Sequence, residues 1–365
     1  MRPLSDQSMA RLRADVDLPD LDGTAYQLVR KIGSGGMSTV YLADDLKLGR
    51  RVAVKVLSAP DESGELAARM TREARIIAQL EHPGIVPVHD VGTLADGRVY
   101  YAMKLVQGRR LDNYEAPLSD RLRVFQRACD AVAFAHASGV IHRDLKPENL
   151  MIGAYGEVLV MDWGIAKVLS LPRADSSEIR EQEAAPSAHA DGLEHGETLS
   201  QRLSVGPALD TAHGTVIGTP AYMSPEQALG EVAALDERTD VYSLGAILYY
   251  ILTGRPPYAS ATIADIRQRF LTQTPIGPRR LDRKIPRAIE SVCLKALSKD
   301  ARDRYRSAEE MSADVARFLD GLPVSAHRES LLEKSARVLN RNRFLVVLIL
   351  VYLLMRILVA FFAGR

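Results

Sequence analysis

The sequence reads Ile141-His142-Arg143-Asp144-Leu145-Lys146-Pro147-Glu148-Asn149 in one stretch and Val160-Met161-Asp162-Trp163-Gly164 in another. The first stretch places an aspartate, a lysine two positions later and an asparagine five positions later in one loop. The second places an aspartate between an apolar strand and an aromatic residue. Phosphoryl transfer needs a group that orients a hydroxyl, cations that neutralise the transferring phosphoryl, and acids that hold those cations. Together the two stretches indicate a phosphoryl-transfer site.

A glycine-rich turn lies closer to the N-terminus, where residues 32–41 read IGSGGMSTVY between two strand-like segments. Glycine lets backbone amides approach phosphates because no Cβ stands in the way. The third glycine of a G-x-G-x-x-G pattern is replaced by Ser38, and no Gly-Lys-Ser/Thr ends the turn, so it is not a P-loop. A glycine turn in a hairpin is more often only a turn, so this motif alone is weak support for phosphate binding.

A lysine follows in the apolar segment VAVKVL, residues 52–57. Taken alone, Lys55 is more often a solvated strand residue. Glu73, however, lies on a predicted helix and offers an ion-pair partner. Because a buried lysine is costly unless it is paired, such a pair would keep Lys55 charged and direct it at a phosphate.

Strand-like segments follow one another from Tyr26 to about Asp112, rich in Val, Ile, Leu and Tyr. The exception is residues 65–80, where apolar residues recur at helical spacing. After Ser119 the pattern is helical, with helices expected near 121–139, 240–253, 286–298 and 307–320. The sequence therefore predicts an α+β fold: a small β-rich lobe with one helix (25–107), a larger helical lobe (108–320), and a cleft between them.

Composition excludes several other classes of protein. Of the 365 residues, 47% are hydrophobic and 25% charged, so disorder throughout is excluded. The formal net charge of +1 argues against a nucleic-acid-binding protein. Two cysteines, Cys129 and Cys293, are too few for a disulfide scaffold or a Cys-rich zinc site, and we expect buried thiols. Residues 1–24 lack a signal peptide's apolar core and are expected to form a flexible leader.

The motifs together resemble the protein kinase family, specifically the bacterial members of the eukaryotic-like serine/threonine kinases. The resemblance extends from Tyr26 to Leu319 and rests on GSGGMSTVY, VAVKVL, Glu73 before HPGIV, HRDLKPEN, DWG, GTPAYMSPEQ, DVYSLG and the late Arg304. It implies the bilobal protein kinase fold and transfer of the γ-phosphate of ATP to Ser and Thr hydroxyls of protein substrates. Lys146 within HRDLKPEN resembles serine/threonine rather than tyrosine specificity.

The resemblance also implies roles for single residues. Lys55 would contact the α- and β-phosphates of ATP and pair with Glu73. Asp144 would orient the substrate hydroxyl, and Lys146 would steady the γ-phosphate. Asn149 and Asp162 would hold Mg²⁺, with Mn²⁺ as an alternative cation. The residues expected around ATP are Ile32, Gly33, Ser34, Gly35, Gly36, Val40, Ala53, Lys55, Met103, Lys104, Val106 and Asn149.

Outside the nucleotide site, Asp240 resembles the helix acid that braces the catalytic loop, and Glu226 with Arg304 resembles the pair that anchors the end of the activation segment. The chain departs from the family pattern at three places. Trp163 replaces the usual phenylalanine and is expected to pack in its place. Lys104 stands in the hinge where an acid is common, but the hinge binds adenine through its backbone. Ser224 replaces alanine before Pro-Glu, a mild change.

Arg143 precedes the catalytic aspartate, and in the family such an arginine can bind a phosphate on the activation segment. Thr211 and Thr215 are the candidate phosphorylation sites for autophosphorylation, which would need transient contact between two copies. Thr219 more often shapes the substrate pocket in the family. Residues 169–213 are rich in Ser, Ala, Gly, Pro and acids and predict a long insertion in the activation segment. We expect this insertion to be a tolerated surface segment rather than a docking element.

The C-terminus carries the apolar segment 344–363, FLVVLILVYLLMRILVAFFA. At ~1.5 Å rise per residue it is long enough to cross a hydrocarbon core of ~30 Å. A central Arg costs ~2.5–3.5 kcal/mol, which the surrounding apolar residues offset. We therefore expect a single transmembrane helix in the inner cell membrane, contacting lipid, after a juxtamembrane helix or linker (321–343). The positive-inside rule keeps the kinase domain in the cytoplasm because four basic residues precede the span: Lys334, Arg337, Arg341 and Arg343.

Several alternatives remain open at this point. The C-terminal segment could instead form an interfacial helix or a dimerising helix. A pseudokinase scaffold that binds partners without catalysis is disfavoured because the predicted catalytic residues are intact, from Lys55 to Asp162. A small-molecule kinase of similar fold is disfavoured because GTPAYMSPEQ resembles a platform for a peptide substrate.

Overall fold

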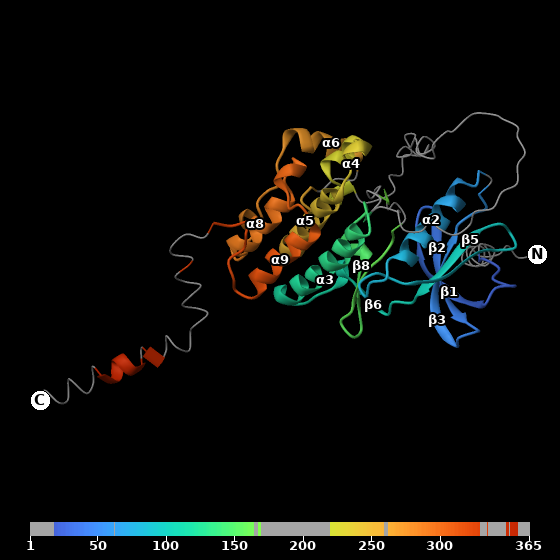
Figure 1. Ribbon diagram of the computed structural model, residues 1–365, viewed down its shortest axis with the longest axis horizontal. Coiled ribbons are helices and arrows are strands. Elements are labelled where there is room, and N and C mark those ends of the chain that lie inside the picture. The colour runs from blue at the N-terminus through green and yellow to red at the C-terminus, as the bar shows by residue number, and fades with distance from the viewer. Residues whose placement is uncertain are drawn as a thin grey trace, which may run out of the picture.

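The computed structural model describes residues 18–61, 63–163, 167–168, 220–258, 262–328, 334, 348–349 and 351–356. These residues form a β-rich lobe and a helical lobe, which Figure 1 shows side by side. This arrangement confirms the predicted α+β fold with two lobes. The predicted insertion 169–213 lies outside the described residues.

A five-stranded antiparallel sheet forms the β-rich lobe, with the strand order β1-β2-β3-β5-β4. Alternate residues of each strand face opposite sides of the sheet. One side faces helix α2 and the helical lobe, and the other carries a separate apolar cluster that includes Tyr41, Val54 and Tyr100. The strands are β1 (Tyr26–Ser34), β2 (Ser38–Asp45), β3 (Arg50–Leu57), β4 (Val88–Thr93) and β5 (Val99–Lys104).

The last part of the predicted leader belongs to this lobe. Leu21 is buried in the outer cluster of the sheet, and the Thr24 side chain accepts a hydrogen bond from the backbone of Tyr26 at 3.1 Å. Residues 18–24 thus continue the packing of the sheet, in contrast to the flexible leader expected over 1–24. The first seventeen residues of that leader lie outside the described part of the chain.

Helix α2 (Glu65–Gln79) confirms the helix predicted over residues 65–80 and ends one residue earlier. Its buried face consists of apolar side chains at helical spacing, including Met70, Ala74 and Ile77. Glu73 lies on the same face and is only 6% exposed. A carboxylate in this position requires partners, which the sheet provides.

Helix α5 (Glu237–Thr253) forms the centre of the helical lobe, and twelve of its seventeen residues are buried. Gly245 allows close contact with α8, because a Cβ at this position would lie 2.8 Å from the Cβ of Ala296. Cys129 and Cys293 are both fully buried free thiols, as expected. The structure confirms the helices predicted near 121–139, 240–253, 286–298 and 307–320. The other helices of this lobe are α3 (Leu118–Ala137), α4 (Pro225–Leu229), α6 (Ile263–Thr272), α7 (Pro278–Leu281), α8 (Arg287–Ala296) and α9 (Ala308–Leu319).

Asp314 of α9 binds the chain that follows the helical lobe. Its Oδ1 accepts the backbone N–H of Ser325 at 2.7 Å, and its Oδ2 accepts the Ser325 hydroxyl at 2.7 Å and the Ala326 N–H at 3.1 Å. The Tyr305 hydroxyl donates to Oδ2 at 2.8 Å, and Val324 is buried. Residues 321–328 therefore pack on the helical lobe as turns, whereas a juxtamembrane helix or linker was predicted from 321 onward. We call this group of contacts the Asp314 clamp.

Within the described residues, no helix combines the length and the apolar character needed to cross a membrane. The structure describes only residues 348–349 and 351–356 of the predicted span 344–363, and all of these are helical. Their large apolar side chains are exposed. The span itself stays a prediction.

We expect the Asp314→Ala variant to unfold with a free energy about 2–3 kcal/mol lower at pH 7, because four buried hydrogen-bond donors lose the carboxylate that accepts from them. Burial alone would raise the pKa of Asp314, but hydrogen bonds from Ser325, Tyr305 and Ala326 outweigh it and lower the pKa. The stabilisation is therefore present above the unfolded-state pKa of about 3.9 and is lost as the pH falls through the lower folded-state value. Denaturant unfolding of both chains in detergent at pH 7 and in acid measures this difference.

Asp320→Asn is the matched control, because this aspartate is exposed at the end of the same helix. Its stability should equal that of the wild type at both pH values. A wild-type advantage over Asp314→Ala that persists undiminished in acid would contradict the assignment to the ionised carboxylate.

Candidate active site

Two neighbouring strands bring the catalytic stretches together. The loop 142–149 lies between β7 (Val140–Ile141) and β8 (Leu150–Gly153), and Asp162 follows β9 (Val158–Val160). Because β8 and β9 are antiparallel, with Leu150 opposite Val160, the start of one lies beside the end of the other. The Met161 N–H donates to the carbonyl oxygen of Asn149 at 2.8 Å and joins the two segments directly.

Asp144 makes contacts with Lys146 and Asn149 of its loop. The Lys146 ammonium donates to Oδ2 of Asp144 at 2.8 Å. The Asn149 amide nitrogen donates to the carbonyl oxygen of Asp144 at 2.8 Å. Since the amide nitrogen is occupied in this way, the amide oxygen of Asn149 is the atom available to a cation. The carboxylate of Asp144 stays partly exposed, so a hydroxyl can reach it.

Asp240 of α5 holds the backbone of this loop. It is completely buried, and its carboxylate accepts the N–H groups of His142 at 2.7 Å and Arg143 at 2.8 Å. His136 of α3 contacts the same carboxylate at 2.8 Å. Burial alone would raise the pKa of Asp240, but the bonds to His136 and to the backbone amide of His142 outweigh it and lower the pKa. These bonds also hold Arg143 at a φ of 71°, a left-handed conformation that is costly for a residue with a Cβ.

Lys55 lies between two carboxylates. Its Nζ contacts Oε1 of Glu73 at 2.8 Å and Oδ1 of Asp162 at 2.9 Å. Burial would lower the pKa of Lys55, yet its neighbours Tyr101, Asp162 and Glu73 outweigh this effect and raise the pKa well above its usual value. The same contact lowers the pKa of Asp162 against the opposing effect of burial. Both groups are therefore charged at neutral pH, and the pair links β3 to the segment after β9.

The sheet register places the predicted nucleotide residues on one face. Lys55 pairs with Val40 of β2 on one side and with Tyr101 of β5 on the other, and Ala53 pairs with Met103. Residues paired across neighbouring strands share a face. Val40, Ala53 and Met103 thus form an apolar surface next to the charged group of Lys55. Lys104 follows Met103 and is exposed, and the hinge continues through Val106.

The glycine-rich turn joins β1 to β2, and the Gly35 N–H donates to the carbonyl oxygen of Ser38 at 2.8 Å. A Cβ at Gly33 would lie 3.8 Å from Val40, and one at Gly35 would lie 3.5 Å from that carbonyl oxygen. Both are ordinary contacts, so the packing of the protein does not itself require glycine here. The bare backbone suits the close approach of a phosphate. Ile32 and Ser34 lie at the end of β1, and Gly36 lies in the turn between the two strands.

The donor set fits Mg²⁺ bound together with a nucleotide. Asp162 is about half exposed toward the cleft, and Asn149 has its amide oxygen free of the loop contact. Over the described ranges, no cluster of three or more His, Cys, Asp or Glu residues could hold a metal ion. Mg²⁺ typically takes one or two protein ligands together with waters and substrate phosphates. One carboxylate and one amide oxygen are therefore sufficient for such a site.

Trp163 follows Asp162 and is buried to 1% exposure, as expected for an aromatic residue there. Its ring lies 4.5 Å from that of His142, measured between centroids. His142 in turn contacts the carbonyl oxygen of Met161 at 2.9 Å. The larger aromatic residue is thus accommodated without separating the two loops.

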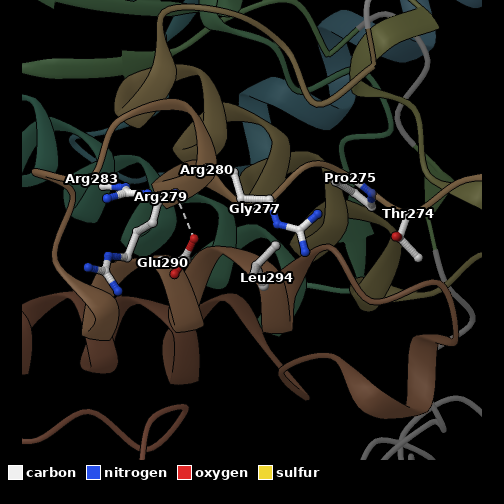
Figure 2. Close-up of a pocket in the computed structure, with 8 residues that line it drawn as sticks. All are labelled: Thr274, Pro275, Gly277, Arg279, Arg280, Arg283, Glu290 and Leu294. Carbon is white, nitrogen blue, oxygen red and sulfur yellow. Dashed lines mark hydrogen bonds between the residues drawn. The ribbon is translucent and has the colours of Figure 1, made fainter.

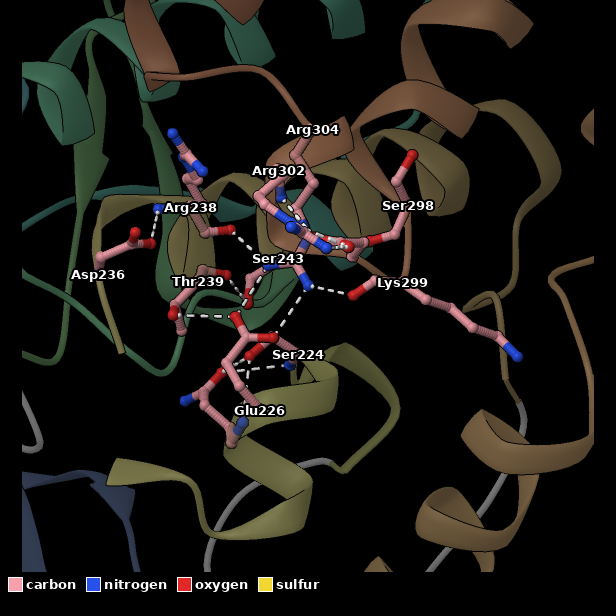
Figure 3. Close-up of polar contacts among 12 residues, drawn as sticks. Ser224, Glu226, Asp236, Arg238, Thr239, Ser243, Ser298, Lys299, Arg302 and Arg304 are labelled. Carbon is pink, nitrogen blue, oxygen red and sulfur yellow. Dashed lines mark hydrogen bonds and ion pairs between the residues drawn. The ribbon is translucent and has the colours of Figure 1, made fainter. Parts of the chain in front are cut away.

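Glu226 and Arg304 form the predicted ion pair, with two parallel contacts of 2.8 and 2.9 Å (Figure 3). Thr239 donates a third hydrogen bond to the Glu226 carboxylate at 3.0 Å. The neighbouring Gln227 donates through its side-chain amide to the carbonyl oxygen of Arg143 at 2.6 Å. Ser224 begins α4 with a capping box, so the serine adds a helix cap that alanine would lack. The end of the activation segment is therefore attached directly to the catalytic loop.

A second hollow lies in the helical lobe, between the segment that precedes α7 and helix α8 (Figure 2). Its volume is about 620 Å³. It contains none of the predicted site residues, and it is lined by Thr274, Pro275, Gly277, Arg279, Arg280, Arg283, Glu290 and Leu294.

The sequence did not single out Tyr101, whose hydroxyl donates to Oε1 of Glu73 at 2.8 Å. The alternation in VYYAMK was an available signal, because it places Tyr101 and Met103 on the same face of a strand. His136, which contacts Asp240, gave no signal beyond its place near the end of a helix. Several predicted residues lie outside the described part of the chain: Gly164, Thr211, Thr215 and Thr219.

The comparisons with known proteins agree with this geometry. A family model described as the protein kinase domain matches residues 26–187 and 199–315. The serine/threonine-protein kinase PknD of Protochlamydia amoebophila is 37% identical over 317 residues, which cover 81% of this chain and 30% of that protein. The serine/threonine-protein kinase PknB of Mycobacterium tuberculosis is 38% identical over 336 residues, which cover 87% of this chain and 48% of that protein.

The chain thus spans less than half the length of these two relatives. Among solved structures, the crystal structure of the Mycobacterium tuberculosis PknI kinase domain matches with a TM-score of 0.55 and 24% identity. The match covers 80% of this chain and 96% of that one, and it shows the same bilobal fold. The family match, the fold and the assembled site lead to one conclusion: the chain belongs to the protein kinase family.

Proposed function

We propose that the chain is an active serine/threonine protein kinase that transfers the γ-phosphate of ATP to hydroxyl groups of proteins. One observation carries the proposal: Lys55 contacts Glu73 and Asp162 at the same time. A backbone hydrogen bond joins the segment that contains Asp162 to the loop that contains Asp144. A scaffold without catalysis has no need to keep these charged groups in contact.

In the proposed reaction, the substrate hydroxyl oxygen attacks the γ-phosphorus, the bond to the bridging oxygen breaks, and ADP leaves. Asp144 would orient the hydroxyl and accept its proton, and Lys146 would steady the γ-phosphoryl group beside it. Lys55 would hold the α- and β-phosphates. Asn149 and Asp162 would hold Mg²⁺ or Mn²⁺, which when bound neutralises charge on the phosphates.

Protein substrates are favoured over small alcohols by the position of α4. Gln227 binds the carbonyl oxygen of Arg143, and Glu226 is anchored in the helical lobe by Arg304. These contacts hold a surface beside Asp144 on which an extended peptide can lie. A small alcohol would not need such a platform. Lys146 in the catalytic loop favours Ser and Thr over Tyr as acceptors.

We expect Asp144→Asn to reduce phosphate transfer about 10²–10⁴-fold, because the loop keeps its geometry but loses its proton acceptor. The measurement is incorporation of label from radiolabelled ATP into a mixture of Ser/Thr peptides. Asp120→Asn, an exposed aspartate at the start of α3, is the matched control and should keep full activity. Equal labelling by the wild type and Asp144→Asn would indicate a contaminating kinase and favour the scaffold.

The proposal includes autophosphorylation of the activation segment, at Thr211 or Thr215. Support comes from Arg143, whose Nε is buried and has no hydrogen-bond partner among the described residues. Burial, together with the neighbouring charge of Arg69, lowers the pKa of Arg143 against the opposing effect of Asp240. A phosphate group would supply the missing anion and order the segment.

Phosphatase treatment is therefore expected to lower the activity of the purified enzyme by about ten-fold, since removal of the phosphate leaves Arg143 without its partner. Mass spectrometry of the active enzyme should find a phosphate within 204–215. The Thr211→Ala, Thr215→Ala double variant should show low activity that the phosphatase does not change. An active enzyme with an unmodified segment would contradict this mode of activation.

We also propose that residues 344–363 anchor the chain in the inner cell membrane as a single helix, with both lobes in the cytoplasm. Exposed apolar residues within 348–356 support the proposal, since contiguous apolar surface of this kind requires a partner or a membrane. The basic residues between 334 and 343 would contact the cytoplasmic lipid surface.

We expect the full-length chain to stay in the membrane pellet after carbonate extraction and a variant ending at residue 343 to be released. The span buries about twenty apolar side chains in lipid, which carbonate does not disrupt. Release of the full-length chain by carbonate would favour an interfacial helix instead. Retention of both chains would show that residues 344–363 are not the anchor.

A further inference from the structure

Tyr101 lies in the middle of β5, directly opposite Lys55 in the register of the sheet. Its side chain is 1% exposed. The hydroxyl donates to Oε1 of Glu73 at 2.8 Å, and the Lys55 ammonium contacts the same oxygen at 2.8 Å. One carboxylate oxygen therefore accepts two donors, one from each of two neighbouring strands.

The ring of Tyr101 also contacts the lysine. The Lys55 ammonium lies 5.6 Å from the ring centroid, within the range of a cation–π contact. Tyr101 thus touches both members of the ion pair, one through its ring and the other through its hydroxyl. Of the residues described, it is the only one for which both contacts are seen.

The hydrogen bond from Tyr101 to Glu73 matters more for the position of helix α2 than for the positions of strands β3 and β5. The sheet holds β3 and β5 in register through backbone hydrogen bonds, whereas Glu73 projects from a separate helix. Lys55 has an alternative partner in Asp162 at 2.9 Å. If Lys55 were the only group holding Glu73, the lysine could turn to Asp162 and the helix could move away. The tyrosine hydroxyl gives the glutamate a second attachment to the sheet that does not depend on the lysine.

We infer that Tyr101 is a positioning residue for the nucleotide: its hydroxyl fixes the Glu73 carboxylate against Lys55, so that Lys55 stays directed at the phosphates. The inference rests on the proposed kinase function and extends it to a residue that would not touch the substrate. Its chemistry requires a hydroxyl on a rigid ring at this point of β5, which phenylalanine cannot replace.

The Tyr101→Phe variant removes one oxygen atom and keeps the ring. We expect kcat/KM for ATP to fall about ten-fold, the scale of a lost hydrogen bond to a charged group. The KM for the peptide substrate should stay close to that of the wild type, while the thermal unfolding midpoint should fall slightly because a buried hydrogen bond is lost. A residue that served only the packing of the lobe would also lower the unfolding midpoint, but it would not separate ATP from peptide.

Tyr100→Phe is the matched control. Tyr100 is the preceding residue, is also buried, and faces the outer cluster of the sheet. Its hydroxyl makes no hydrogen bond with any residue in the described part of the chain, so its removal should leave kcat/KM for ATP unchanged. Equal values for Tyr100→Phe and Tyr101→Phe would overturn the inference.

A double-mutant cycle with Glu73→Ala separates the hydrogen bond from ring packing. In the Glu73→Ala background the side-chain acceptor is absent, so Tyr101→Phe should reduce kcat/KM for ATP by less than about two-fold. If the two reductions instead multiply, Tyr101 acts independently of Glu73 and the inference is wrong. An inactive wild type would overturn the proposed function and this inference with it. If the wild type is active but the two reductions multiply, only the inference is overturned.

Discussion

The buried carboxylate of Asp240 is the constraint on which the active-site geometry depends. The loop 142–149 is not a strand, and two of its amides donate to Asp240, which lies in the centre of the helical lobe. Those bonds hold Arg143 in a left-handed conformation. Because most of α5 is buried, the carboxylate cannot shift without disturbing the core. The position of Asp144 is thus fixed by Asp240, which is completely buried and would not contact a substrate.

A second chain of contacts joins the two lobes in front of that loop. Lys55 belongs to the sheet and Asp162 to the helical lobe, and their 2.9 Å contact joins the two lobes. Glu73 connects the same lysine to α2. The Lys55 ammonium therefore links a carboxylate of helix α2 to a carboxylate of the helical lobe. A shift of either carboxylate changes the contacts of the lysine and, with them, its contact to the other.

Much of this arrangement could be predicted from local sequence patterns. The spacing of Met70, Ala74 and Ile77 predicts a helix with Glu73 on its buried face, and a buried acid requires a cation such as Lys55. Tyr101 could not be assigned a role in this way, because its partner follows from the pairing of β3 with β5, two strands far apart in the chain. The Asp314 clamp was missed for a similar reason: two of its four donors are backbone amides, which no residue type in the sequence identifies.

The Asp314 clamp also determines where the chain leaves the helical lobe. Residues 329–343 separate the clamp from the proposed anchor. At ~3.5 Å per residue their contour length is about 50 Å, an upper limit whatever structure they adopt. A kinase tethered in this way samples only a thin layer of cytoplasm beside the bilayer. Membrane-bound substrates, and other copies of the same enzyme, would then be encountered at a high effective concentration, and distant soluble proteins would not.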